Sequence, residues 1–263
     1  MTRFVWILVA GALLLAGCSE APTGRSRLAL VPEGMLAQMG EQSFAEMRRR
    51  RPAVTGTPAN ALVQCVTREV AAAAGAVYPG VTLPDAWEVV LFEDPSPNAF
   101  ALPGGRIGVH TGLLRVAESP AQLAAVIGHE VAHVLAEHGN ERLTQQLGIR
   151  AVLLVVGLFS EGDLAGEPLM RALGLGAHLG IALPFSRAHE EEADAMGLAI
   201  MAEAGFDPRE STALWRNMAA AGGGQPPEFL STHPAHDSRI QGLEAAMDAA
   251  LARYRDADPA RCG

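Results

Sequence analysis

Residues 129–133 read His-Glu-Val-Ala-His, and this short stretch decides most of what the sequence predicts. In an α-helix, residues four apart lie one turn from each other, so His129 and His133 can reach one metal ion together. Glu130 is rotated off that line, where its carboxylate can take a proton from a zinc-activated water molecule. The pattern H-E-x-x-H therefore predicts a helix that carries two zinc ligands and a general base.

The residues before this stretch predict where the helix begins. Ser119 is a suitable N-cap, Pro120 fits the first helical position, and Gln122 completes a capping box. The helix then runs apolar as far as Leu135 apart from the site residues. Polar groups are costly in such a buried helix unless they have a ligand to bind.

A peptidase zinc ion needs a third protein ligand, and residues 186–194 (SRAHEEEAD) supply candidates. Glu190 and Asp194 are one turn apart and share a helix face with Gly197, which lets this helix approach the first one closely. We expect Glu190 to bind zinc and Asp194 to accept a hydrogen bond from a ligand histidine. Spacing alone does not choose among the three glutamates 190–192, and a solvated acidic face is the alternative.

Together these stretches resemble the HtpX/Oma-type zinc metallopeptidases, which are relatives of the CAAX prenyl protease and include bacterial periplasmic lipoproteins such as BepA. Four blocks carry the resemblance in the family's order, at residues 98–105, 129–133, 186–194 and 231–240. The resemblance implies a zincin-like (gluzincin) domain with one Zn²⁺ per chain. It implies zinc on His129, His133 and Glu190, Glu130 as general base, and Asp194 in support of the ligands.

The resemblance also places the loop that carries His233 beside the metal. There, His233 would either stabilise the oxyanion of the reaction or occupy the open zinc position. His236 competes for this role, and His233 can alternatively be a plain residue of the loop before a helix that starts near Pro234. Asn98 is a further candidate for substrate contact, with a turn residue as the alternative.

The amino terminus predicts an export signal. An apolar run at residues 4–15 ends in Leu-Ala-Gly before Cys18, which is the layout of a secretory signal and resembles the bacterial lipobox. We expect removal of residues 1–17, a lipid on Cys18, a tether over residues 18–32 and a zinc metallopeptidase domain over residues 33–263.

This leader predicts a location in the periplasm with a lipid anchor. Ser19 after the lipidated cysteine resembles lipoproteins that are sent to the outer membrane. The compartment permits disulfides, so we expect Cys65 and Cys262 to pair and pin the carboxyl-terminal tail to an early helix.

Composition excludes several classes of function. The chain carries a formal net charge of −9, which argues against nucleic-acid binding. All of its basic residues are arginine, so mechanisms that use a lysine side chain are excluded. The length suits one sizeable domain.

Patterning predicts an α+β fold that is mainly α. Helical patterns and strand-like runs, with a tight turn at residues 103–105, predict a small, mainly antiparallel sheet beside the active-site helix. The helices are expected at residues 34–49 and 58–77, and the strands at residues 87–92, 98–102 and 106–111. An edge strand next to the cleft could hold an extended peptide by main-chain pairing. Residues 150–183 read as a lid, a lipid-contacting hairpin or plain core.

The expected function is that of a lipid-anchored periplasmic zinc endopeptidase, which hydrolyses misfolded or stalled envelope and outer-membrane proteins. Its expected partners are these unfolded or misassembled proteins, and the membrane through the anchor at Cys18. The reaction type follows from the residues, and the quality-control role follows from the resemblance. The alternative is a chaperone or assembly factor for outer-membrane proteins with little or latent proteolysis.

Overall fold

The computed structural model describes residues 18–145, 185–221, 228–234 and 237–262. The H-E-x-x-H stretch lies in helix α4 (Pro120–Leu135), and the second acidic stretch lies in helix α7 (Arg187–Glu203). Each helix starts at a serine cap, because the Ser119 and Ser186 hydroxyls accept a hydrogen bond from a backbone N–H of the first turn. The local sequence therefore fixes where both site helices begin.

Helices α4 and α7 pack against each other through two glycines. A Cβ atom on Gly197 would lie 2.7 Å from the backbone nitrogen of His129, and one on Gly128 would lie 2.9 Å from the Gly197 carbonyl oxygen. Both distances are too short for a real side chain, so the two backbones meet only because neither residue has one. This contact brings Glu190 and Asp194 up to the histidines of α4.

A three-stranded sheet lies beside α4. It consists of β3 (Glu88–Phe92), β4 (Ala99–Leu102) and β5 (Arg106–His110) in the order β3-β5-β4. The turn at residues 103–105 joins β4 and β5 as an antiparallel hairpin, whereas β3 pairs with β5 in parallel. The sheet is therefore mixed, because β3 adds to it in parallel beside β5. Strand β4 lies at an edge of the sheet.

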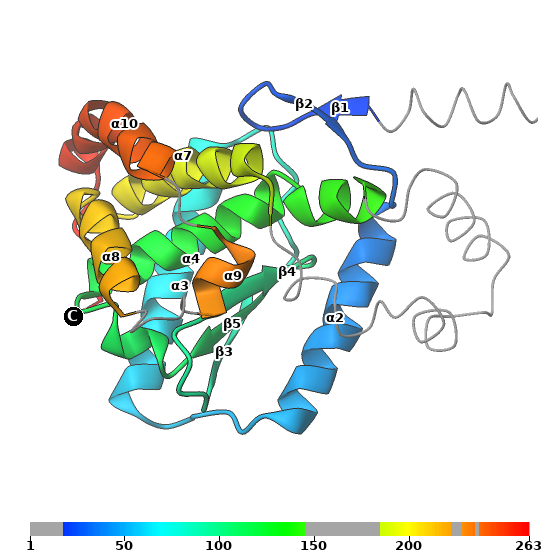
Figure 1. Ribbon diagram of the computed structural model, residues 1–263, viewed down its shortest axis with the longest axis horizontal. Coiled ribbons are helices and arrows are strands. Elements are labelled where there is room, and N and C mark those ends of the chain that lie inside the picture. The colour runs from blue at the N-terminus through cyan, green and yellow to red at the C-terminus, as the bar shows by residue number, and fades with distance from the viewer. Residues whose placement is uncertain (1–17, 146–184, 222–227, 235–236, 263) are drawn as a thin grey trace, which may run out of the picture.

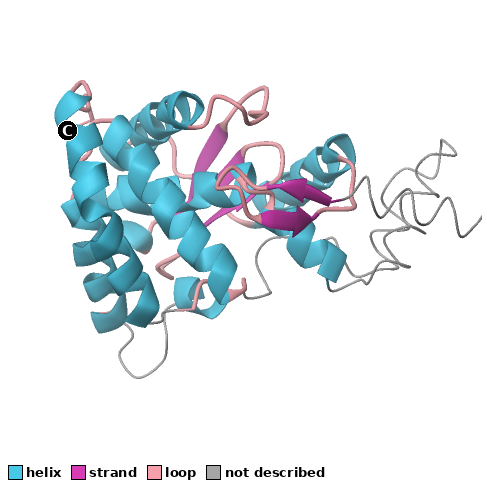
Figure 2. Ribbon diagram, turned by 90° about the horizontal axis from the view of Figure 1, so that it is seen from above, coloured by secondary structure: helices cyan, strands magenta, loops and turns pink. Residues whose placement is uncertain are grey.

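Both faces of the sheet are covered by helices. Alternate residues of a strand point to opposite faces, so Phe92 and Phe100 pack on Phe44 of helix α2 (Glu33–Arg50), with ring centroids 5.9 and 6.5 Å from Phe44. The other face joins the main core with α3 (Pro58–Val77) and α4. Figures 1 and 2 show the strands between these helices. The predicted fold class, α+β and mainly α, is confirmed.

The remaining elements are the 3₁₀ turn η1 (Leu113–Arg115) and the helices α8 (Arg209–Ala220), α9 (Glu228–Thr232) and α10 (Asp237–Asp256). Of these, α10 packs on α7 and α8 packs on α4. The structure joins Cys65 of α3 to Cys262 in a disulfide, with the Cα atoms 5.7 Å apart. The carboxyl-terminal tail is thus pinned to α3, the helix that packs behind α4.

The amino-terminal segment differs from the tether expected at residues 18–32. It forms an antiparallel hairpin of β1 (Cys18–Glu20) and β2 (Ser26–Leu28). The hairpin docks on the rest of the chain because Arg25 and Arg27 find carboxylates there, at distances of 2.5–2.6 Å. Charge pairing across distant segments, which patterning along the chain does not show, explains the difference. The lipid on Cys18 stays a prediction.

The apolar stretch at residues 150–183 lies outside the described residues, and so do residues 1–17. Among the helices that the structure describes, none combines the length and the apolar character needed to cross a bilayer.

Replacing Gly197 with alanine tests the close contact between α4 and α7. The new methyl group would have to push the α4 backbone away, and overpacking of this kind costs about 1–3 kcal/mol. We therefore expect Gly197→Ala to lower the free energy of unfolding by that amount, measured by urea denaturation.

Gly242→Ala is the matched control, because a Cβ atom there meets nothing within 4 Å. At this exposed position of α10 the change should raise stability by about 0.5–1 kcal/mol. A Gly197→Ala protein as stable as the wild type would show that the two backbones do not depend on this contact.

Candidate active site

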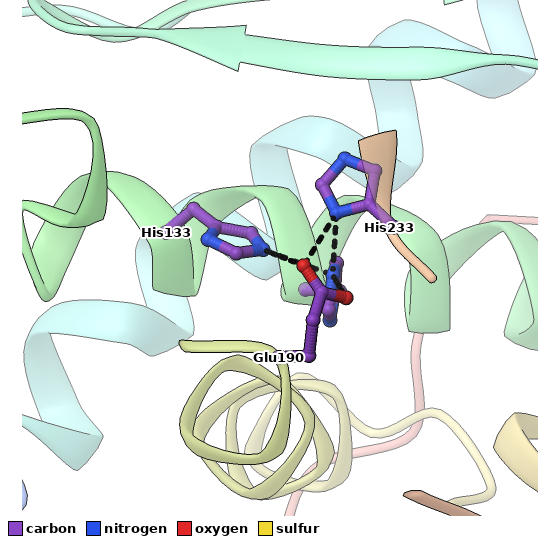
Figure 3. A group of neighbouring side chains, drawn as sticks. His133, Glu190 and His233 are labelled. Carbon is purple, nitrogen blue, oxygen red and sulfur yellow. Dashed lines mark hydrogen bonds and ion pairs between the residues drawn. The ribbon is translucent and has the colours of Figure 1, made fainter. Parts of the chain in front are cut away.

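Four buried side chains from three segments meet between α4 and α7. His129 and His133 come from α4, Glu190 comes from the first turn of α7, and His233 follows α9 (Figure 3). Each of these residues is at most 3% exposed. The structure therefore brings together the three ligands that the sequence predicts, and it places His233 beside them.

The distances within this cluster fit one zinc ion. His129 Nε2 lies 3.0 Å from His133 Nε2, 3.2 Å from His233 Nδ1 and 3.5 Å from a Glu190 carboxylate oxygen. Tetrahedral zinc with bonds of about 2.0–2.1 Å separates its ligand atoms by roughly 3.3–3.4 Å. A set of imidazole nitrogens and a carboxylate oxygen at this spacing is what Zn²⁺ prefers.

Electrostatics also favour a cation here. Burial lowers the pKa of His129, but its contacts with Asp194 and Glu190 outweigh this and raise the pKa to about 9. Burial and the neighbouring imidazoles hold the pKa of His133 well below its usual value, so this ring is neutral and has a free lone pair. Positive charge is thus favoured at the centre of the cluster, and the neutral ring of His133 can bind a cation there.

Asp194 orients the imidazole of His129. Its carboxylate lies 2.9 Å from His129 Nδ1, on the side of the ring that faces away from the cluster. The Nδ1–H group therefore donates to Asp194, and Nε2 is the nitrogen that can exchange its proton for a metal, which is how ligand histidines are usually fixed.

Arg239 is a site residue to which the sequence assigned no role. Its guanidinium donates to both carboxylate oxygens of Asp194, at 2.6 and 2.7 Å, and lies 2.6 Å from Glu190. It also lies over the Trp215 ring, 3.8 Å from the centroid. Arg239 therefore holds the two acidic residues in register. The only signal for it was its place in the 231–240 block.

Glu130 lies beside the cluster. One of its carboxylate oxygens accepts a hydrogen bond from the Ala101 N–H of β4 at 2.9 Å, and the other lies 3.4 Å from His233 Nε2. Within the described part of the chain this second oxygen accepts no hydrogen bond. Burial raises the pKa of Glu130, which suits a group that takes up a proton and gives it back.

The three successive glutamates of α7 have different surroundings. Glu190 is fully buried in the cluster, whereas Glu191 accepts a hydrogen bond from Ser238 at an exposed position. Glu192 contacts His138, a buried histidine that the sequence analysis did not single out. A third histidine five residues after His133 was the available signal for it.

Two weaker candidates have mixed outcomes. Asn98 precedes β4 and is 2% exposed, and its side-chain oxygen has no hydrogen-bond partner among the described residues. A role for it in substrate contact stays a prediction. His236 lies outside the described residues.

The fold and this site define a metallopeptidase with the H-E-x-x-H arrangement. The sequence model of the family described as Peptidase family M48 matches residues 58–247. The chain belongs to Peptidase family M48.

Relatives in mitochondria and bacteria share parts of the sequence. The mitochondrial metalloendopeptidase OMA1 of Arabidopsis thaliana is 41% identical over 67% of this chain and 35% of its own length. The protein of that name from Saccharomyces cerevisiae is 30% identical over 96% of this chain and 78% of its own length. The β-barrel assembly-enhancing protease of Yersinia pestis is 31% identical over 54% of this chain and 31% of its own length.

The chain is shorter than several of these relatives. It spans 35% of the Arabidopsis thaliana protein and 50% of the OMA1 protein of Schizosaccharomyces pombe.

The predicted location, a bacterial periplasm with an anchor in the outer membrane, is wrong. The relatives at 41% and 39% identity are named mitochondrial, as are four further OMA1 proteins, whereas the bacterial proteases match at 31% and 28%. The prediction depended on the first residues of the chain alone.

Replacing Asp194 with asparagine tests the orientation of His129. The amide keeps the shape of the side chain but loses the charge that holds Arg239 and favours the Nδ1–H tautomer. Changes of this kind typically weaken metal binding about 10–100-fold. We expect that loss of zinc affinity in Asp194→Asn, measured by competition with a chromophoric chelator.

Glu203→Gln is the control, because Glu203 lies on the same helix and pairs only at the surface with Arg253. It should bind zinc like the wild type. Wild-type affinity in Asp194→Asn would contradict the orienting role.

Proposed function

We propose that this chain is a zinc-dependent endopeptidase that cleaves extended, unfolded segments of membrane proteins. His129, His133 and Glu190 would hold the zinc ion, and Glu130 would act as general base. The observation that carries the proposal is the position of Glu130, which lies between the ligand cluster and the edge strand β4. The site therefore has its proton carrier at the place where a peptide can bind.

An extended peptide can pair with β4. In an antiparallel pair, alternate residues of an edge strand turn their N–H and C=O groups away from the neighbouring strand. Ala101 belongs to this outward set because its N–H donates to Glu130. Main-chain pairing along this edge would grip a substrate without demanding one sequence, which suits an enzyme that acts on unfolded chains.

A large cavity supports a peptide substrate. Its volume is about 1070 Å³, and it is lined by Ala101 of β4, His133, Phe185, and parts of α2 and the loop after α3. Small-molecule sites typically measure about 300–1000 Å³, so this cavity exceeds their usual range. Both Ala101 of the edge strand and the proposed ligand His133 line it.

The residues divide the chemistry between them. Zinc would supply a Lewis acid that polarises the scissile carbonyl and acidifies a water molecule. Glu130 would take the proton from that water and deliver it to the leaving amine, and its raised pKa favours this exchange. Asp194 and Arg239 keep the ligands in place throughout.

The quality-control role rests on two supports. The relatives are named metalloendopeptidases and, in Yersinia pestis, a β-barrel assembly-enhancing protease. The second support is the edge strand, which would bind main chain rather than particular side chains. Unfolded or misassembled membrane proteins are therefore the proposed substrates.

A binding role with latent proteolysis is the second candidate, and one observation favours it. His233 Nδ1 lies 3.1 Å from a Glu190 oxygen and 3.2 Å from His129 Nε2, within the ligand set itself. In this geometry His233 takes the position that a water molecule needs. A chain held in this state would bind clients and cut rarely.

Replacing Glu130 with glutamine separates the two roles. The amide cannot carry the proton, so we expect cleavage of an unfolded β-barrel protein to fall about 10²–10⁴-fold in kcat/KM while one zinc ion per chain is retained. The measurements are a gel-based cleavage assay, with and without chelator, and metal analysis.

Glu191→Gln is the matched control, because this neighbouring glutamate is exposed and bonds Ser238. It should cleave like the wild type. Undiminished cleavage by Glu130→Gln, or by the chelated wild type, would overturn the proposed mechanism. Full cellular function of Glu130→Gln would favour the binding role.

A further inference from the structure

Behind His133 lies a second buried histidine on the side away from the cluster. Helix α4 ends at Leu135, and Glu137 adopts a left-handed conformation with φ of 54° before the chain becomes helical again at residue 138. This break turns His138 back toward α4, where its Nδ1 lies 2.9 Å from His133 Nδ1. His138 is 0% exposed.

Only one arrangement of protons satisfies all of these contacts and leaves His133 able to bind a metal. The Glu192 carboxylate, 3.0 Å from His138 Nε2, can only accept a hydrogen bond, so His138 Nε2 carries a proton. The Nδ1 atom of His138 is then the acceptor, and His133 Nδ1–H donates to it. The Nε2 lone pair of His133 is thereby directed into the ligand cluster.

We propose that His138 is the positioning residue for the ligand His133, in the way that Asp194 is for His129. This inference rests on the proposed zinc site. The two ligand histidines of α4 thus have different supports, a carboxylate for one and a neutral imidazole for the other. The group that bonds His138 Nε2 decides which nitrogen of His138 can accept a hydrogen bond from His133. The residues that position His133 therefore include the partners of His138 as well.

That support reaches the amino-terminal hairpin. Glu192 accepts hydrogen bonds from Thr23 and, at 2.6 Å, from Arg25 Nε. The same guanidinium pairs with Glu141 at 2.6 Å, and Glu141 accepts from His189 at 3.1 Å. A continuous set of bonds therefore joins the loop between β1 and β2 to the ring of His133.

Arg27 of the same hairpin fixes the break in the chain after α4. It donates to the Ala136 carbonyl at 2.8 Å and pairs with the Glu137 carboxylate at 2.5 Å. Glu137 is the left-handed residue that turns His138 inward. The hairpin thus holds both the conformation that places His138 and the carboxylate that orients it.

The cluster of His138, Glu141 and His189 does not itself need a metal ion. Both ring nitrogens of His138 already have partners, and Arg25 supplies the positive charge that Glu141 and Glu192 require. The protein should therefore bind one zinc ion per chain, and not two.

The test compares three variants of the full chain. His138→Phe keeps the flat ring but removes the acceptor, whereas His138→Asn keeps an acceptor near the place of Nδ1. We expect zinc affinity to fall about 10–100-fold in His138→Phe, as for other supports of ligand histidines, and to recover most of the way in His138→Asn. The visible spectrum of the Co²⁺-substituted protein should change in His138→Phe only.

His110→Phe is the matched control, because His110 is also a fully buried histidine but contacts Arg51 and Ser96 rather than a proposed ligand. It should bind zinc like the wild type. Wild-type affinity in His138→Phe, or an equal loss in His110→Phe, would overturn the positioning role.

If His138→Phe does not fold, Arg25→Gln decides the question. The Arg25 side chain is 29% exposed, so its loss is tolerated more easily. Several-fold weaker zinc binding in that variant supports the inference, and unchanged binding overturns it. If the wild type binds zinc and these variants bind it equally well, the positioning role is wrong and the proposed function stands. If the wild type does not bind zinc, the proposed function is wrong as well.

Discussion

The structure depends on the contact between the glycines of α4 and α7. A helix pair separated by ordinary side chains would hold Glu190 too far from the histidines of α4 to share one ion with them. The glycine contact lets the backbones meet at Gly128 and Gly197, one position before His129 on α4 and three positions after Asp194 on α7. Ligand geometry is thus set by the absence of two side chains.

The contact buries several acidic side chains together, and a metal ion would offset their negative charge. Glu130, Glu190 and Asp194 are buried together. Arg239 contacts Glu190 and Asp194, and His129, whose pKa is raised, contacts the same two carboxylates. Buried charges are stable only when they are paired and hydrogen-bonded. A divalent cation between the imidazoles and Glu190 would balance the remaining negative charge. The supports behind the two histidines then become part of the metal site rather than ordinary packing.

Sequence reasoning predicted what depends on short spacing and missed what depends on tertiary contacts. Helical period and local chemistry predict the two histidines of H-E-x-x-H, the N-cap of α4, and the placement of Glu190 and Asp194 one turn apart. The role of Arg239 follows only from the return of α10 to the site. His138 is turned inward because Glu137 adopts the left-handed backbone conformation, which glutamate rarely does and which the sequence therefore does not predict. The hairpin at residues 18–28 looked like a tether because its arginines find their carboxylates more than 100 residues away.

X-ray absorption at the zinc edge tests the central claim most directly, because it measures the ligands of the bound ion in the intact protein. We expect a shell of nitrogen and oxygen atoms alone at about 2.0–2.1 Å, with the outer scattering of at least two imidazoles. A third imidazole would show that His233 closes the site. A sulfur shell at about 2.3 Å, or a spectrum without imidazole scattering, would contradict the convergence of α4 and α7 on one zinc ion.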